Sequence, residues 1–164
     1  MDELIKIVAK YFIVLSLVGT LVLLLRLKPK DRKQYIAVLL LGGALAGLLA
    51  FIGSQLYHNP RPFIQGGFTP LLPHGNDNGF PSDHTLLAAM LGWAALIFSR
   101  KIGIALLVLA ALIGASRMAA GLHHLIDVIG GFVCAGLGVW VANLLVKKYV
   151  ARQAAGSKAD GAES

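Results

Sequence analysis

Residues 102–146 read IGIALLVLAALIGASRMAAGLHHLIDVIGGFVCAGLGVWVANLLV, and this stretch decides the fold. It holds two apolar blocks, 102–118 and 124–146, each close to the roughly 20 residues that a helix needs to cross a membrane. The short joint between them carries polar and ionisable side chains, which are costly at membrane depth and typical of functional sites there. The stretch therefore predicts two membrane-spanning helices with a polar site at the end where they are joined.

Three further apolar blocks precede this pair, at residues 4–26, 34–57 and 82–99. The chain is 57% hydrophobic and only 14% charged, which leaves too little polar surface for a soluble globule of this size. These features predict an all-α, polytopic membrane helix bundle with about five transmembrane helices. The third and fourth blocks are short, which suggests a helical hairpin whose outer end lies below the membrane surface, inside the protein.

Positive charge lies in short clusters between the apolar blocks and gives the chain a formal net charge of +7. No basic stripe carries interleaved aromatic side chains, so the charge does not indicate nucleic-acid binding. Lys and Arg in short connections mark the cytoplasmic side of a membrane. This rule places the N-terminus and the connection 58–81 outside. The clusters are Arg26, Lys28, Lys30, Arg32 and Lys33, then Arg100 and Lys101, then Lys147, Lys148, Arg152 and Lys158.

The connection of residues 57–81 contains five of the six prolines, which excludes a plain helix. It predicts an ordered extracytoplasmic cap between the second and third spans. Residues 1–150 are predicted to form one membrane domain, and residues 151–164 a disordered cytoplasmic tail. Gly43 and Gly47 form a small-residue pair that predicts close helix packing in the second span.

His123 and Asp127 lie four residues apart at the start of the last span, so they share one face of a helix. The carboxylate can hold one ring N–H of the histidine, which leaves the lone pair of the other nitrogen exposed. It also stabilises the positive charge that develops when that nitrogen attacks phosphorus. The pair is typical of an activated histidine nucleophile.

Ser82 stands where the N-cap of the third span is expected, so free backbone N–H groups and the positive helix end suit a phosphate. His84 follows in the first turn, within reach of a leaving oxygen. Arg61, between Pro60 and Pro62, and Arg117, at the end of the fourth span, supply two guanidinium forks suited to phosphoryl oxygens.

The order and spacing of these residues resemble the type 2 phosphatidic acid phosphatase superfamily, whose members share three motifs around a phosphohistidine mechanism. Three cap segments narrow the resemblance to the bacitracin-resistance type of undecaprenyl pyrophosphate phosphatases: Pro60-Arg61-Pro62-Phe63, Leu72-Pro73-His74 and Phe80-Pro81-Ser82-Asp83-His84-Thr85. The resemblance covers about residues 54–127. Ser116-Arg117, His123 and Asp127 match the third motif, Pro81-Ser82-Asp83-His84 matches the second with Asp83 in place of the usual Gly, and Arg61-Pro62 matches the end of the first.

One position departs from the superfamily, because the first motif begins with a Lys seven residues before the Arg, and Ser54 stands there in this chain. We hypothesise that Lys10, in the first span, supplies the missing cation. The alternative is a lysine whose ammonium merely reaches the membrane interface.

The resemblance implies hydrolysis of undecaprenyl pyrophosphate to undecaprenyl phosphate, a step of lipid-carrier recycling for peptidoglycan synthesis that confers bacitracin resistance. It implies a multi-pass protein of the bacterial cytoplasmic membrane with its site on the outer side, and six spans in some relatives. No metal or cofactor is expected, and the partners are the polyprenyl substrate and membrane lipids. The expected catalytic residues are His123, His84 and Asp127, and the expected phosphate ligands are Arg61, Arg117, Ser82 and Lys10.

Three other interpretations stay open at this point. The motifs recognise phosphate, so the substrate can be another lipid phosphate such as phosphatidylglycerophosphate or phosphatidate. A non-catalytic transport subunit with a His–Asp relay is less favoured, because a relay distributes its ionisable groups through the membrane depth. A structural metal site is disfavoured by the two neighbouring arginines; its ligands would be His84, His123, His124 and Asp127. The sequence does not predict the oligomeric state.

Overall fold

The computed structural model describes residues 1–160, with the side chains of residues 1–155. This part of the chain is helical and contains no named strand. Its only β-type pairing is an isolated antiparallel bridge between Pro60 and Asn78. The helices are α1 (Asp2–Arg26), α2 (Pro29–Leu56), α3 (Pro62–Gly66), α4 (Asp83–Phe98), α5 (Arg100–Ala119) and α6 (Leu125–Asp160).

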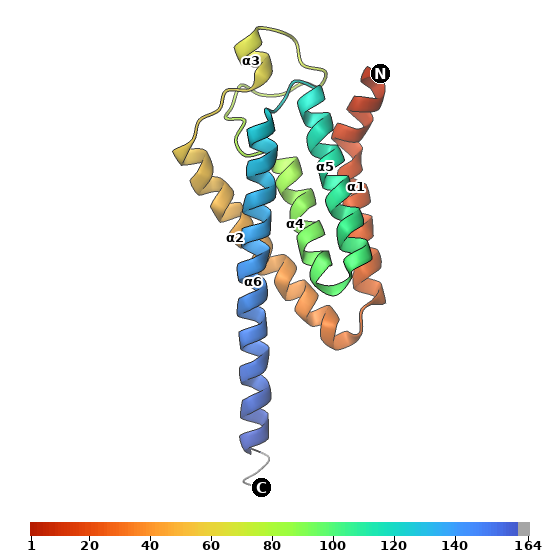
Figure 1. Ribbon diagram of the computed structural model, residues 1–164, viewed down its shortest axis with the longest axis vertical. Coiled ribbons are helices and arrows are strands. Elements are labelled where there is room, and N and C mark those ends of the chain that lie inside the picture. Colours follow the sequence, from red (N-terminus) through yellow and green to blue (C-terminus); the bar gives the residue numbers. More distant parts are fainter. Residues whose placement is uncertain (161–164) are drawn as a thin grey trace.

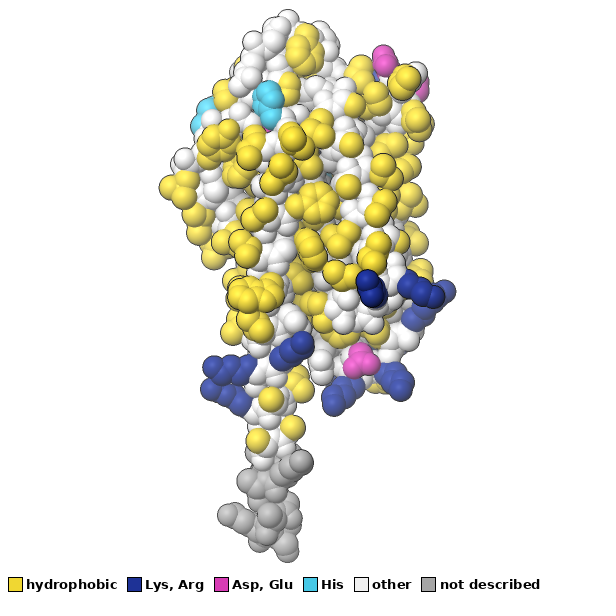
Figure 2. Space-filling view, viewed as in Figure 1, with side chains coloured by type: hydrophobic (Ala, Val, Ile, Leu, Met, Phe, Trp, Pro, Cys, Tyr) yellow, Lys and Arg dark blue, Asp and Glu magenta, His cyan; other side chains and the backbone are white. Residues whose placement is uncertain are grey.

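Five of these helices form the membrane bundle, which confirms the predicted fold class. Helices α1, α2, α5 and residues Leu125–Ala155 of α6 are long and apolar enough to cross a membrane, and α4 is a shorter apolar helix. Figure 2 shows apolar side chains over most of the bundle surface. Such a surface suits a lipid environment, so the chain is a multi-pass membrane protein.

The prediction of two short spans is confirmed for one helix only. Helix α4 has 16 residues, whereas α5 has 20 because it begins directly at Arg100 and continues to Ala119. Helix α4 packs against α1, α2, α5 and α6, and Figure 1 shows its first turn below the upper ends of α5 and α6. The start of α4 is therefore enclosed by protein, as expected for a recessed polar site.

Helices α2 and α6 cross with their backbones in contact. A Cβ atom on Gly138 would lie 2.6 Å from the backbone nitrogen of Ala46 and 2.8 Å from the carbonyl oxygen of Gly42. The predicted contact through Gly43 and Gly47 is wrong, because a Cβ on Gly47 would meet no atom within 4 Å and one on Gly43 only the end of a methionine side chain. The crossing uses the neighbouring small residues instead.

The two ends of the bundle differ in charge. Figure 1 shows the N-terminus and α3 at one end and the C-terminus at the other, and the Lys and Arg side chains visible in Figure 2 gather toward the C-terminal end. This arrangement agrees with five spans and with cationic connections on one side. Which side faces the cytoplasm stays a prediction.

Helix α6 continues to Asp160, although the sequence predicts disorder from residue 151. Ala, Arg and Gln dominate residues 151–155, and all three have high helix propensity, so the last span extends without a break. The rest of the predicted tail, residues 161–164, lies outside the described residues.

Candidate active site

The connection between α2 and α4 forms a cap whose fold depends on one side chain, Asn78. Its carbonyl oxygen accepts hydrogen bonds from the backbone N–H groups of Asn59 and Phe80, at 2.9 and 3.0 Å. Its amide donates to the carbonyl oxygens of Ser54 and Tyr57, at 3.0 and 2.9 Å. All four hydrogen bonds of the side-chain amide are thus made. They tie the cap to the end of α2.

Arg61 is almost fully buried beneath this cap. Its Nη1 donates to the carbonyl oxygen of Leu122 at 3.0 Å and lies 3.2 Å from Nε2 of His123. Its Nε donates to Oδ1 of Asp77 at 2.8 Å. This bond holds the pKa of the Asp77 carboxyl below its ordinary value. The guanidinium is therefore locked in place, with one edge turned to the predicted nucleophile.

The surroundings of His123 identify which ring nitrogen is unprotonated. Nδ1 lies 3.0 Å from the carbonyl oxygen of Gly79 and 3.5 Å from Oδ2 of Asp127, and both of these atoms are acceptors. We therefore assign the proton to Nδ1, which leaves the lone pair on Nε2. The ring N–H is held chiefly by Gly79 and only secondarily by the predicted carboxylate.

Asp127 is fully buried and links several parts of the site. Oδ1 accepts from the side-chain amide of Asn59 at 2.8 Å, and Oδ2 accepts from the backbone N–H of His124 at 2.8 Å. The second bond is of the capping-box type, in which an acidic side chain in the first turn accepts from the backbone N–H just before its own helix. The backbone carbonyl of Asp127 accepts from the N–H of Ser82 at 3.0 Å, which joins the starts of α4 and α6.

Arg117 lies near the end of α5 and is only 4% exposed. Among the described residues it makes no side-chain hydrogen bond or ion pair, and its Nε is buried without a partner. It lies within electrostatic range of Arg61 and Asp83. A buried guanidinium without a partner is costly unless an anion joins it. The site is therefore cationic and suits an anion.

The first turn of α4 lies at the same end of the bundle, where the backbone N–H of Ser82 donates to the carbonyl oxygen of Asp127 at the start of α6. Ser82 is the N-cap residue and is fully buried, but its hydroxyl accepts from Thr85 Oγ1 at 3.1 Å and makes no side-chain cap bond. His84 lies within electrostatic range of Arg117, Asp83 and His123. The structure thus collects the predicted residues of α4, α5 and α6 at one end of the bundle, together with Arg61. Phosphate binding by Ser82 stays a prediction.

Lys10 is not brought to this group. It is exposed on α1, and its ammonium lies 5.2 Å from the centre of the Tyr11 ring. No hydrogen bond or ion pair joins it to the site within the described part of the chain. The role of Lys10 as a phosphate ligand stays a prediction without support from its position, and Ser54, at the position of the missing motif lysine, takes part only in the cap.

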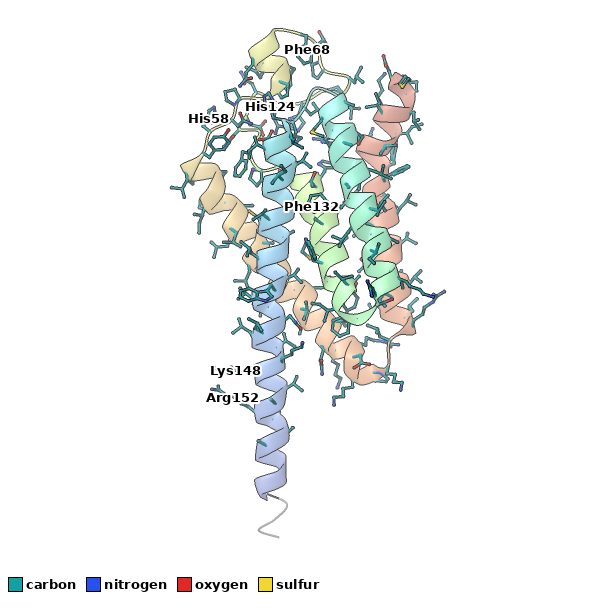
Figure 3. All side chains as sticks on the ribbon, in the orientation of Figure 1. His58, Phe68, His124, Phe132, Lys148 and Arg152 are labelled. Atoms are coloured by element: carbon teal, nitrogen blue, oxygen red, sulfur yellow. The ribbon has the colours of Figure 1, made fainter. Side chains whose placement is uncertain are left out.

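The remaining histidines are at or near the cap, as Figure 3 shows for His58 and His124. The His74 ring lies edge-on to that of His123, with 6.4 Å between ring centres, and its Nδ1 is 3.6 Å from Oδ1 of Asp77. Partial burial and the charge of Arg61 lower the pKa of His74. It is therefore a neutral neighbour of the site at pH 7.

No group of three or more His, Cys, Asp or Glu side chains within residues 1–155 is arranged to hold a metal ion. The positive charge at this site comes from guanidinium groups, which suit the oxygens of a phosphoryl group.

Gly79 offers a test of the cap. A Cβ added there would lie 2.9 Å from the carbonyl oxygen of Asn59 and 3.1 Å from Oδ2 of Asp127, so Gly79→Ala must displace the carbonyl that holds His123. We expect kcat to fall about 10- to 100-fold, as for other small misplacements of catalytic groups. Gly75→Ala is the control in the same cap, since a Cβ there meets no atom within 4 Å. Equal rates for the two variants would contradict this account.

A buried histidine beside a buried arginine at one end of a membrane helix bundle is an arrangement suited to a membrane phosphatase. The chain belongs to the PAP2 superfamily, which residues 33–151 match. This match confirms the resemblance drawn from the three motifs.

Two relatives share more than 30% of their aligned residues with the chain. Undecaprenyl-diphosphatase BcrC of Bacillus subtilis (strain 168) is 34% identical over 136 residues, which cover 82% of this chain and 69% of that protein. The bacitracin transport permease protein BcrC of Bacillus licheniformis is 32% identical over 132 residues, which cover 80% of this chain and 64% of that protein. The chain thus spans about two thirds of the length of these relatives.

Two crystal structures have the same fold. LpxE of Aquifex aeolicus superposes with a TM-score of 0.68 at 23% identity, covering 86% of this chain and 84% of that one. The PAP2-type phosphatidylglycerolphosphate phosphatase of Bacillus subtilis gives a TM-score of 0.57 at 23% identity, covering 92% and 77%. At this identity the likeness concerns the fold alone.

Proposed function

We propose that the chain hydrolyses undecaprenyl pyrophosphate to undecaprenyl phosphate and inorganic phosphate through a phosphohistidine on His123. One observation carries the chemistry: the buried guanidinium of Arg61 lies 3.2 Å from Nε2 of His123, and that of Arg117 is buried at the same end of the bundle. A phosphoryl group is the anion that suits such a site. The names of the BcrC relatives support the choice of a bacitracin-related pyrophosphate substrate.

In the first step, Nε2 of His123 attacks the terminal phosphorus and the bond to the bridging oxygen breaks. Arg61 and Arg117 hold the three peripheral oxygens, where negative charge is spread in the transition state. Gly79 and Asp127 hold the N–H on Nδ1 and stabilise the positive imidazolium ring as the N–P bond forms. His84 donates a proton to the departing lipid phosphate.

In the second step, water attacks the phosphohistidine. His84, which has lost its proton, removes one from the water, and the N–P bond breaks to release inorganic phosphate. His123 then regains its free Nε2 lone pair. Each turnover consumes one water and requires no redox partner.

The location of the reaction follows from the basic segments. The site lies at the end of the bundle opposite the Lys and Arg of the C-terminal half of α6 and the α1–α2 turn. With those residues in the cytoplasm, the site faces the outer side of the bacterial cytoplasmic membrane. The polyprenyl chain then stays in the bilayer while its charged head enters between the helices.

The deciding experiment compares substrates in detergent. We expect kcat/KM for undecaprenyl pyrophosphate to exceed that for phosphatidylglycerophosphate and phosphatidate by at least about tenfold. The physical reason is the leaving group, since a phosphate is a weaker base than the alkoxide that the two glycerolipids release. EDTA is expected to leave the rate unchanged, because guanidinium groups supply the positive charge.

The substrate and the mechanism can be contradicted by different outcomes. Faster release from either glycerolipid phosphate would reassign the substrate and keep the mechanism. Loss of activity in EDTA, restored by a divalent metal ion, would overturn the mechanism.

A further inference from the structure

A second cavity lies at the opposite end of the bundle, between α2 and α6. The two helices are in backbone contact at Gly42 and Gly138 and separate toward the basic end, where they leave a groove of about 510 Å³. The groove is lined by Lys30, Lys33, Gln34, Ala37, Leu41, Leu145, Val146, Tyr149 and Val150. Its lining is therefore an apolar wall with two ammonium groups at one edge.

The charges at this edge have no partners. Neither Lys30 nor Lys33 makes a hydrogen bond or ion pair within the described residues, and no acidic side chain lines the groove. Arg32 behaves differently, because it donates to the carbonyl oxygens of Leu24, Leu25 and Leu27. It therefore fixes the α1–α2 turn and with it the start of α2. The two lysines are exposed at the edge of the groove and are free to bind an anion.

The groove cannot belong to the phosphatase site. Tyr149 is 22 residues beyond Asp127 on the same helix, a distance of about 33 Å along the axis. This separation is comparable to the roughly 30 Å apolar thickness of a bilayer. The groove thus lies at the opposite membrane interface, near Lys147 and Lys148, where phospholipid head groups are found.

We propose that this groove binds an anionic phospholipid of the leaflet opposite the phosphatase site. The lipid phosphate lies between Lys30 and Lys33, and one acyl chain follows the apolar wall formed by Ala37, Leu41 and Leu145. Basic pockets between transmembrane helices are suited to anionic head groups. Two ammonium groups without a carboxylate favour an anionic lipid over a zwitterionic one, because the zwitterionic head group carries a positive charge of its own.

The test measures thermal stabilisation of the full chain in detergent by added dioleoyl-phosphatidylglycerol, since a ligand of the folded state raises Tm with its concentration. We expect Lys30→Gln/Lys33→Gln to raise the lipid concentration for half-maximal stabilisation about 30-fold, or about fivefold per lysine. Dioleoyl-phosphatidylcholine and inorganic phosphate are expected to stabilise neither protein through this groove. The first has no net negative charge, and the second has no acyl chain.

The matched control removes two charges from α6, on the side that faces away from the groove. Figure 3 shows Lys148 and Arg152 extending from α6 on the side away from the start of α2, and neither lines the groove. Lys148→Gln/Arg152→Gln is expected to keep the stabilisation by phosphatidylglycerol. Equal loss in both double variants, or equal stabilisation by phosphatidylcholine, would overturn the proposal.

A third variant tests the apolar wall. Ala37→Phe keeps every charge and fills the groove, so it is expected to abolish stabilisation by phosphatidylglycerol. Because the groove is remote from His123, all these variants are expected to keep the rate of phosphate release in detergent, which also reports correct folding. Full stabilisation of Ala37→Phe by the lipid would place the lipid elsewhere.

Discussion

Arg117→Met is expected to abolish phosphate release and, at the same time, to raise the melting temperature of the protein. The guanidinium is buried, and its Nε has no partner among the described residues. In the enzyme without substrate this charge is largely removed from solvent, and replacing such a charge with an apolar side chain of similar volume is often neutral or stabilising. In the transition state the same group binds phosphoryl oxygens, so its loss is expected to lower kcat/KM by on the order of 10³-fold.

The measurements are phosphate release from undecaprenyl pyrophosphate and the melting temperature in phosphate-free detergent. Arg100→Met is the matched control, because it makes the same change at the exposed first residue of the same helix. It is expected to leave both quantities unchanged. Inorganic phosphate, as a product, is expected to stabilise the wild type and not Arg117→Met. A large drop in melting temperature for Arg117→Met would mean that the guanidinium has a structural partner and is not held for the substrate.

The helices could be predicted because the signals for them are local. A run of apolar residues between basic clusters is visible without knowledge of the fold, and the predicted span 82–99 differs from the observed Asp83–Phe98 by one residue at each end. The three motifs are similarly local, and their order along the chain allowed Arg61, His123 and Asp127 to be assigned to one site. The structure brings these three together.

The cap could not be predicted, because its contacts join residues with no regular spacing. Gly79 supplies the nearest acceptor for His123, and Asn59 supports Asp127, yet neither position carries a signal in a stretch already rich in Pro and Gly. Asn78 makes four hydrogen bonds that close the cap. Its neighbour Asp77 pairs with Arg61, and no charge pattern in the sequence indicates that pairing.

The sequence predicted that the second span makes a close helix contact, but not which residues form it. Small residues in the second span indicated a close contact, but which glycine makes it depends on how α6 lies across α2. Gly42 and Gly138 are far apart in the chain. In the sequence Gly42 looks the same as its neighbour Gly43, and only the contact with Gly138 in the folded protein shows that Gly42 lies at the helix crossing. The residues that a small-residue pattern brings into contact are therefore decided by the partner helix.

His123→Asn is expected to remove the covalent intermediate and to lower kcat by at least about 10³-fold. The asparagine amide can still donate to the carbonyl oxygen of Gly79, which now accepts from Nδ1 of His123 at 3.0 Å, so the cap is expected to stay in place. Rapid quenching with substrate labelled on the terminal phosphate is expected to trap an acid-labile, base-stable phosphoenzyme in the wild type. The variant is expected to show no such species.

His124→Asn is the control, since it makes the same substitution one residue further along. The His124 imidazole has no bond to the reacting groups, and it is the backbone N–H of this residue that binds Asp127. Its variant is therefore expected to form the phosphoenzyme and to keep its rate within about threefold, because the backbone bond is unchanged. A labelled phosphoenzyme in His123→Asn, or an equal loss of activity in both variants, would assign the nucleophile to another side chain. Because Nε2 of His123 is the unprotonated ring nitrogen and faces Arg61 at 3.2 Å, the label is expected on that atom.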